Sequence, residues 1–169
     1  MLDLPTPQLN FFADLSVHVD KPQEVGQTLH GVRRLIPILG GEVQGQGWTA
    51  RVLPGGADFQ LILNPRMAEL DARYVIETDG GDLIYVQNRA VRTASPEVMA
   101  KLVRGEPVAP ESVYFRCSPS FETASASLGW ICERLFVGTG ARHPDRVVMR
   151  FFEVAWSPVC PLIRLRAAF

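Results

Sequence analysis

The feature of this sequence that most restricts its fold is a series of short, extended segments separated by turns that contain Gly or Pro. The segments are rich in Val, Ile, Phe and Tyr, which favour β-strands. They are FFADLSVHV (11–19), RRLIPILGGEV (33–43), WTARVLPGG (48–56), DFQLILN (58–64), two strands within 69–90, VYFRCSPSFET (113–123), RLFVGTGAR (134–142) and RVVMRFFEVAW (146–156). A spacing of about 8–12 residues is typical of β-sandwiches and β-barrels. The series therefore predicts an all-β fold.

The clearest turn joins two strands within residues 69–90, ELDARYVIETDGGDLIYVQNRA. Gly80 and Gly81 tolerate the positive φ angles that tight hairpin turns require. We predict that Thr78 pairs with Leu83, which places charged side chains on both faces of the hairpin. A barrel wall accounts for such mixed faces, because its inner face can line a cavity with a few fixed polar groups among apolar ones.

The same register, continued to residues 58–64 through a short loop, gathers polar side chains from three adjacent strands. The resulting patch consists of Asp58, Gln60, Asp71, Arg73 and Asn88. It is either the lining of an internal cavity or a solvated outer face with cross-strand ion pairs, and a shift of one residue in either loop would dissolve it. If the faces are exchanged, the residues that line the cavity are Tyr74, Tyr85 and Arg89.

One segment, SPEVMAKLVRGEPV (95–108), breaks the β pattern. Ser95 is suited to cap a helix N-terminus, Pro96 to the first helical position, and Gly105 to the end of the helix. Apolar side chains recur at helical spacing between them. We predict a single short helix over residues 96–104 that lies on the sheet or closes an open end of the barrel.

Three further side chains are candidates for a functional site. Arg116 can contact a carboxylate or enolate oxygen and Glu122 can act as a base, although a salt bridge at the rim of a barrel explains both equally well. Trp130 lies in a segment rich in Ser, Ala and Gly. Its ring either covers a flat ligand by stacking or fills the core.

Charge and cysteine content restrict the partners and the compartment. The 17 basic and 18 acidic side chains give no basic surface for a nucleic acid or an anionic membrane. The three cysteines have neither paired nor metal-ligand spacing, and the first residues lack the basic and then apolar order of a signal peptide. No apolar run reaches the ~20 residues that span a bilayer. We therefore predict a cytoplasmic protein that binds neither nucleic acid nor membrane.

Motifs for metal and cofactor binding do not occur in the sequence. His18, His30 and His143 are far apart and lack the spacing of a zinc site. There is no phosphate-binding loop, dinucleotide-binding glycine motif or nucleophile elbow. The sequence predicts neither a metal nor a cofactor.

The final residues, SPVCPLIRLRAAF (157–169), form an apolar segment after the last predicted strand. Such a segment needs a surface against which to bury itself. We divide the chain into a barrel domain, residues 1–156, and a C-terminal extension, residues 157–169. The extension packs either on its own barrel or on that of a second copy, in a homodimer.

Several segments together resemble the domain-of-unknown-function 3237 family, also called uncharacterised protein family 0311, of bacteria and fungi. They are HGVRRLIPILGGEVQG (30–45), RVLPGGADFQLI (51–62), the hairpin at 69–89, YFRCSPSFET (114–123) and LFVGTGARHPDRVVMRFFEV (135–154). The resemblance runs from about Leu15 to Val154, and the extension and the segment ASASLGWICERL (124–135) depart from it. It implies one antiparallel, up-and-down, calycin-like β-barrel, here of eight to ten strands, and it implies no general activity.

Two functions agree with these observations. One is a cofactor-independent enzyme whose barrel binds a hydrophobic, oxygenated metabolite and promotes its cyclisation, isomerisation or dehydration. Its base would be Asp58, Asp71 or Glu122, its donors Arg73, Arg116 or Tyr85, and its other substrate contacts Gln60, Asn88 and Trp130. The alternative is a small-molecule binder without chemistry. We favour the enzyme, because burying charged groups is costly for a binder of apolar ligands.

Overall fold

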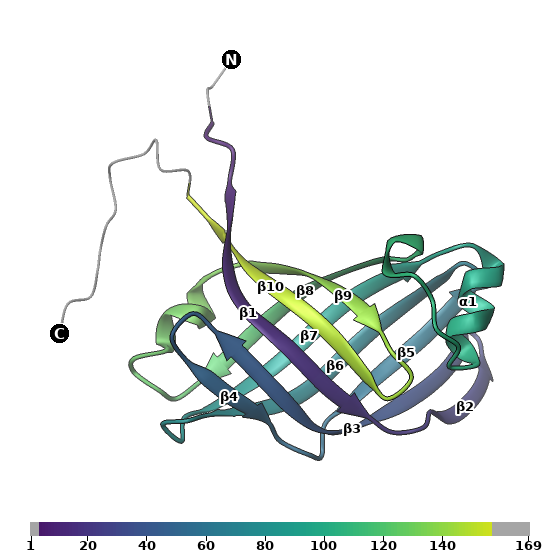
Figure 1. Ribbon diagram of the computed structural model, residues 1–169, viewed down its shortest axis with the longest axis horizontal. Helices are drawn as coiled ribbons and strands as arrows, with labels where there is room; N and C mark the ends of the chain where they lie inside the picture. Colours follow the sequence, from purple (N-terminus) through teal and green to yellow (C-terminus); the bar gives the residue numbers. More distant parts are fainter. Residues whose placement is uncertain (1–3, 157–169) are drawn as a thin grey trace.

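The strands follow one another in antiparallel order and close into a barrel (Figure 1). The structure is a computed structural model, and it describes residues 4–156. The strands are β1 (Gln8–Val19), β2 (Gln23–Thr28), β3 (Gly31–Gly45), β4 (Thr49–Val52), β5 (Ala57–Asn64), β6 (Met67–Thr78), β7 (Leu83–Thr93), β8 (Tyr114–Thr123), β9 (Phe136–Arg142) and β10 (Arg146–Ala155). One α-helix, α1 (Pro96–Val103), and two short 3₁₀ helices, η1 (Pro110–Ser112) and η2 (Gly129–Glu133), join them. The predicted all-β barrel with one helix is confirmed.

Eight strands form the closed wall and two more are added to it. Strands β4 and β5 both lie between β3 and β6, and β2 pairs with β3 alone. The wall closes where β1 pairs with β10 on one side and with β3 on the other. Strand β3 changes partners at Gly40 and Gly41, since its first half pairs with β5 and its second half with β4. Gly41 has a φ of +147°, and a Cβ there would lie 2.1 Å from the carbonyl oxygen of Ser16. Only glycine therefore fits where β1 crosses β3.

The predicted register of the 69–90 hairpin is wrong by one residue. Glu77, not Thr78, is the partner of Leu83. Thr78 pairs instead with Ala50 of β4, and its hydroxyl accepts a hydrogen bond from the Asp82 backbone N–H at 3.1 Å. The shift exchanges the faces of one strand relative to the other, and with it the hairpin separates a mainly apolar inner face from a mainly polar outer face.

The second predicted pairing is also displaced by one residue. Asp58 lies opposite Ala72 rather than Arg73. The reason is a β-bulge in β5, where Leu63 has no partner in β6 and shifts the pairing by one residue. The inner and outer faces of β6 are therefore exchanged relative to the predicted pairing with both of its neighbours, β5 and β7. The predicted polar patch splits, and the residues of β6 leave it.

Aromatic side chains fill the end of the barrel near β4 and η2. The rings of Phe121 and Phe136 lie 5.4 and 4.8 Å from that of Phe12, measured between centroids. Trp48 and Trp130 pack on Phe12 at 5.4 and 6.0 Å. Trp130 packs on the edge of this group of aromatic rings, and 43% of its surface is exposed.

Helix α1 lies at the opposite end of the barrel (Figure 1). The Ser95 hydroxyl accepts a hydrogen bond from the Val98 backbone N–H, and Pro96 begins the helix, as predicted. Met99 and Leu102 are buried against the core. No helix in residues 4–156 is long and apolar enough to cross a bilayer. The predicted extension, residues 157–169, lies outside the described residues.

Candidate functional site

The buried polar side chains gather on three strands that surround the interior. They are Arg34 on β3, Asp58 and Gln60 on β5, and Asn88 and Arg92 on β7, each with at most 8% of its surface exposed. Each occupies an inward position in a strand whose other inward residues are mainly apolar. The barrel interior therefore has an aromatic part near β4 and a polar part toward α1.

A chain of hydrogen bonds fixes the carboxylate of this cluster. Arg34 Nε donates to Gln60 Oε1 at 2.9 Å, and Gln60 Nε2 donates to Asp58 Oδ2 at 2.5 Å. The other carboxylate oxygen, Asp58 Oδ1, is buried and has no hydrogen-bond partner among the described residues. Asp58 is thus held through Oδ2, and its Oδ1 is left buried without a partner among the described residues.

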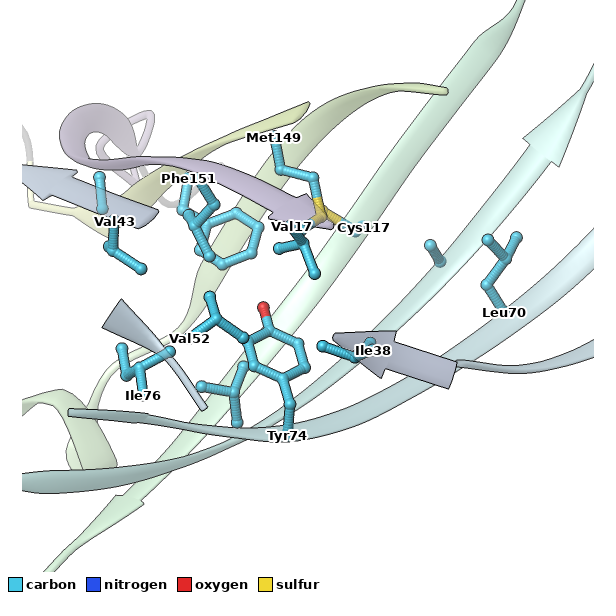
Figure 2. Close-up of a cluster of buried hydrophobic side chains, with 14 of the residues drawn as sticks. Val17, Ile38, Val43, Val52, Leu70, Tyr74, Ile76, Cys117, Met149 and Phe151 are labelled. Carbon is cyan, nitrogen blue, oxygen red and sulfur yellow. The ribbon is translucent and has the colours of Figure 1, made fainter. Parts of the chain in front are cut away.

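A cavity of about 40 Å³ lies beside Asp58 inside the barrel. Its polar lining consists of Asp58, Tyr74, Asn88 and Arg142. The Tyr74 hydroxyl points into the apolar interior, toward Val17 and Met149 (Figure 2). This hydroxyl and Asn88 Oδ1 are also buried and unpartnered within residues 4–156. A water needs about 10–15 Å³ of such space, so the cavity accommodates a group of about three to four non-hydrogen atoms.

Positive charge exceeds negative charge in this part of the interior. Arg34, Arg92 and the partly buried Arg142 face Asp58, which is the one buried acidic side chain of the described residues. Burial lowers the pKa of Arg92 to about 10, and the nearby Arg34 and Arg142 add to this effect. The site therefore has a net positive charge.

The pKa of Asp58 is shifted upward. Burial is the main cause, because it disfavours the charged form. The hydrogen bond from Gln60 and the charges of Arg92 and Arg34 oppose this shift without cancelling it. Burial also raises the pKa of Tyr74, so its hydroxyl stays protonated and available as a donor.

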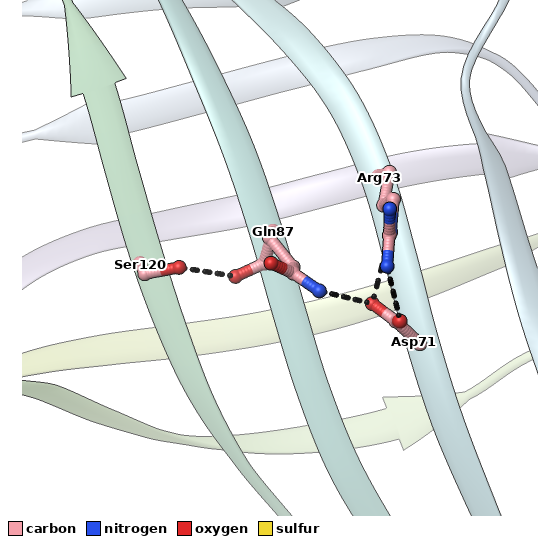
Figure 3. Close-up of polar contacts among 4 residues, drawn as sticks. All are labelled: Asp71, Arg73, Gln87 and Ser120. Atoms are coloured by element: carbon pink, nitrogen blue, oxygen red, sulfur yellow. Dashed lines mark hydrogen bonds and ion pairs between the residues drawn. The ribbon is translucent and has the colours of Figure 1, made fainter.

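Two predicted site residues of β6 lie outside the barrel. Arg73 Nη2 donates to Asp71 Oδ2 at 2.9 Å, and Gln87 Nε2 donates to Asp71 Oδ1 at 3.0 Å (Figure 3). Ser120 extends this network by donating to the Gln87 carbonyl. The network is the solvated outer face that the sequence left as an alternative. Asp71 and Arg73 cannot reach the interior cavity, because they project from the other side of the sheet.

The remaining candidates do not reach the cavity either. Glu122 is exposed and lies opposite Tyr85 on the outer face. Arg116 is exposed and stacks on the ring of Tyr114, with its guanidinium carbon 5.0 Å from the ring centroid. Of the nine predicted site residues, the structure brings Asp58, Gln60 and Asn88 together inside the barrel. Arg89, which the reversed assignment placed inside, is exposed.

Sequence reasoning missed the three interior arginines. A signal was present, because Arg34 precedes Ile36 and Ile38 at alternate positions of one strand. Arg92 ends a similar series in β7, after Ile84, Val86 and Ala90. An arginine that continues an apolar series of alternate residues shares the inner face of its strand. Arg142 follows Phe136, Gly138 and Gly140 in β9, and these glycines give no such signal.

The fold and the site define a closed antiparallel β-barrel with a cationic polar cluster in its interior. Residues 7–154 match the model of the family described as a protein of unknown function, DUF3237, and the chain belongs to this family. A UPF0311 protein of Rhodopseudomonas palustris is 45% identical over 150 residues, which cover 89% of this chain and 98% of the relative.

Solved structures share the architecture. A beta-barrel like protein from Acinetobacter baumannii has a TM-score of 0.79 and 35% identity, and the match covers 90% of this chain and 99% of that one. A more distant structure is described as an enzyme from Penicillium herquei, with a TM-score of 0.66 and 18% identity over 90% of this chain and 98% of that one. The last of these similarities concerns the fold alone.

Proposed function

We propose that the barrel binds a small oxygenated metabolite in its interior and that Asp58 acts on it as a general base, without a cofactor. The reaction class is isomerisation, dehydration or cyclisation. The observation that carries the proposal is the unpartnered oxygen of Asp58, a residue that lines the cavity and whose other oxygen is held by Gln60. A fixed carboxylate with one unpaired oxygen suits proton abstraction.

The chemistry follows from the groups around the cavity. Asp58 Oδ1 takes a proton from a carbon next to a carbonyl group, and the C–H electron pair forms a C=C bond. The carbonyl π electrons move to oxygen, which becomes an enolate. Tyr74 and Arg142 line the same cavity and can donate hydrogen bonds to that oxygen. Return of the proton from Asp58 to another atom completes an isomerisation.

The electrostatics of Asp58 support a role as a base. A carboxyl group with its ordinary pKa is a weak base at neutral pH, and a raised pKa increases its basicity. Burial produces a shift in this direction. A purely structural role would be served at lower cost by apolar side chains of similar volume.

The cavity limits what the site accepts. Its volume of about 40 Å³ suits a carbonyl or carboxyl group with the adjacent carbon. A larger metabolite places only this reacting end in the cavity, and side chains of the wall must move to admit its body. The Penicillium herquei protein with the same fold is described as an enzyme, which supports catalysis on such a barrel.

Hydrogen exchange tests the proposal without a known substrate. We expect the full-length protein in D₂O to accelerate exchange of the α-protons of acetone, pyruvate or acetoacetate, followed by ¹H NMR. Asp58→Asn should reduce the accelerated rate by about 10²–10⁴-fold. Asp71→Asn is the matched control, because Asp71 lies on the outer face.

Two outcomes would contradict the proposal. If a folded Asp58→Asn variant exchanges the protons as fast as the parent, Asp58 is not the base. If these compounds bind but none exchanges faster than in buffer, the barrel is a non-catalytic binder. That second function is favoured by the additional unpartnered oxygens of Tyr74 and Asn88, which suit hydrogen bonding to a ligand.

A further inference from the structure

The interior contains a cation without an adequate counter-ion. Arg92 is only 2% exposed, and its Nε has no hydrogen-bond partner among the described residues. It takes part in none of the ion pairs found within residues 4–156. Its anionic neighbour is Asp58, which also faces Arg34.

Exposed carboxylates do not correct this imbalance. Glu24 approaches Arg34 at 4.0 Å, but more than half of the Glu24 side chain is exposed to solvent. Asp145 lies near Arg142 and is 68% exposed. Water screens both of these charges, whereas Arg92 is shielded from water. Burying an uncompensated charge is costly, and a bound anion removes that cost.

Arg142 has the free donors that such an anion needs. Its Nη1 donates to the backbone carbonyl oxygens of His143 and Arg146 in the β9–β10 turn. These contacts fix the guanidinium at the wall of the cavity, which Arg142 lines. Its Nε and Nη2 form no hydrogen bond within the described residues. This pair of donors is the side of the guanidinium that matches the two oxygens of a carboxylate.

The rest of the cavity suits the carbon end of a small molecule. Val17, Ile38, Leu70 and Phe115 contribute apolar surface to it. A multiply charged anion such as phosphate would meet the carboxyl group of Asp58 and this apolar wall. A short carboxylate satisfies both parts, because its oxygens can face Arg142 and its carbon atoms the apolar wall.

We infer that the interior cavity binds a short-chain carboxylate, held directly by Arg142 in the positive field of Arg34 and Arg92. This inference rests on the proposed function in that it names the ligand class of the same cavity. The carboxylate is the substrate, or the end of the substrate, on which Asp58 would act. Binding itself does not require that Asp58 transfer a proton.

Thermal unfolding of the full-length protein tests the inference, with acetate as the probe. A ligand that binds the folded state raises the Tm in a saturable manner. We expect sodium acetate to do so at a fixed ionic strength maintained with sodium chloride. Acetamide has the same shape without the charge and should have no effect. Absence of an acetate-dependent rise, or an equal rise with acetamide, would overturn the inference.

Variants identify the donor. Arg142→Gln should weaken acetate binding by about 10–100-fold, which corresponds to the loss of a hydrogen-bonded charge. Arg142→Lys keeps the charge without the paired donors, so its acetate affinity should lie between that of the parent and that of Arg142→Gln. Arg89→Gln is the matched control, since Arg89 is exposed on the outer face of β7. Unchanged acetate affinity in folded Arg142→Gln and Arg142→Lys would exclude Arg142 as the donor.

Asp58→Asn separates this inference from the proposed function. The variant lacks the base but retains the arginines, so it should bind acetate at least as tightly as the parent. Acetate binding without any catalysed exchange would support the carboxylate site and contradict the proposed enzymatic function. Catalysed exchange of the acetone α-protons with no acetate binding would support the proposed enzymatic function and contradict the carboxylate site.

Discussion

Arg92 illustrates how one side chain can oppose the stability of the fold. It follows Ile84, Val86 and Ala90 on the inner face of β7, where an apolar residue would continue the core. Its charge is shielded from water, which destabilises the charged form of the side chain. The same burial lowers the pKa of Arg92 to about 10. Functional sites are where such local conflicts between sequence and packing are expected.

Replacement of Arg92 by Met should therefore stabilise the protein. We expect the free energy of unfolding in urea to rise by about 1–2 kcal/mol, because methionine fills similar space without a buried charge. Arg89→Met, on the outer face of the same strand, should change it by less than about 0.5 kcal/mol. A large loss of stability in Arg92→Met would mean that Arg92 and Asp58 act as a tight ion pair.

Asp58 should give the stability of the protein a distinctive dependence on pH. Its folded pKa is raised, so the folded state keeps a proton that the unfolded state releases above its ordinary pKa of about 3.9. The free energy of unfolding therefore falls as the pH rises from about 4 to the folded pKa. Asp58→Asn should remove this decline, as measured by urea unfolding between pH 4 and 8.

Asp71 provides a comparison of opposite sign. Burial pushes its pKa upward, but hydrogen bonds from Arg73 and Gln87 outweigh this effect and leave the pKa below the ordinary value. Its contribution to stability is present above the unfolded pKa and is lost as the pH falls through the folded pKa. Asp71→Asn should consequently lower the free energy of unfolding at neutral pH. In acid, where Asp71 is protonated, the variant and the parent should be equally stable. Parallel pH slopes for the Asp58 and Asp71 variants would contradict at least one of the two assignments.

Among the elements, nine strands and the helix were predictable, the mainly exposed β2 was not, and the register between strands was not. Alternating apolar residues gave the strands, and Ser95 with Pro96 gave the start of α1. The exchange of partners by Thr78 and the bulge at Leu63 each displaced a pairing by one residue. Both depend on contacts with strands distant in sequence or on a local backbone irregularity. Side-chain alternation within one strand carries no information about either.

The same limit explains what was predicted of the site. Asp58, Gln60 and Asn88 remained on one face, because both register errors exchanged the faces of β6 only. The predicted faces of β5 and β7 stayed correct relative to each other. Asp71 and Arg73 were lost with β6. The arginines that complete the cluster come from β3, β7 and β9, and their meeting depends on closure of the whole barrel.

Gly41 gives a prediction at the level of strand pairing. A Cβ at this position would collide with the Ser16 carbonyl oxygen of β1 and would adopt an unfavourable positive φ. Gly41→Ala should therefore lower the free energy of unfolding by about 1–3 kcal/mol, measured in urea. Gly129→Ala is the control, because a Cβ there meets no atom within 4 Å. Equal stability of the two variants would show that β1 and β3 separate without cost.

At the scale of the whole molecule, the barrel has two unlike ends. Phenylalanine and tryptophan rings fill the end near β4, whereas the interior toward α1 carries the arginines and the cavity. The surface near the aromatic end includes exposed Leu9, Leu135 and Trp156. Trp156 directly precedes the extension, residues 157–169, which the sequence predicts to be apolar.

We expect the extension to pack on a second copy, which makes the full chain a homodimer. An apolar segment that follows an exposed apolar surface has most to gain from such a contact. Size-exclusion chromatography with light scattering should give twice the monomer mass for the full chain and the monomer mass for residues 1–156. Equal masses, each divided by the mass of its own chain, would remove the extension from assembly.

The seam between β1 and β10 also determines when the protein can finish folding. Residues 8–19 pair with residues 146–155, so one of the first segments to leave the ribosome waits for one of the last. Until then the nascent chain displays two unpaired strand edges, on β1 and on β9, where other chains can add. Pairings this distant in sequence are slow to form. Translation through β10 is therefore the event that converts a sheet prone to association into a closed barrel.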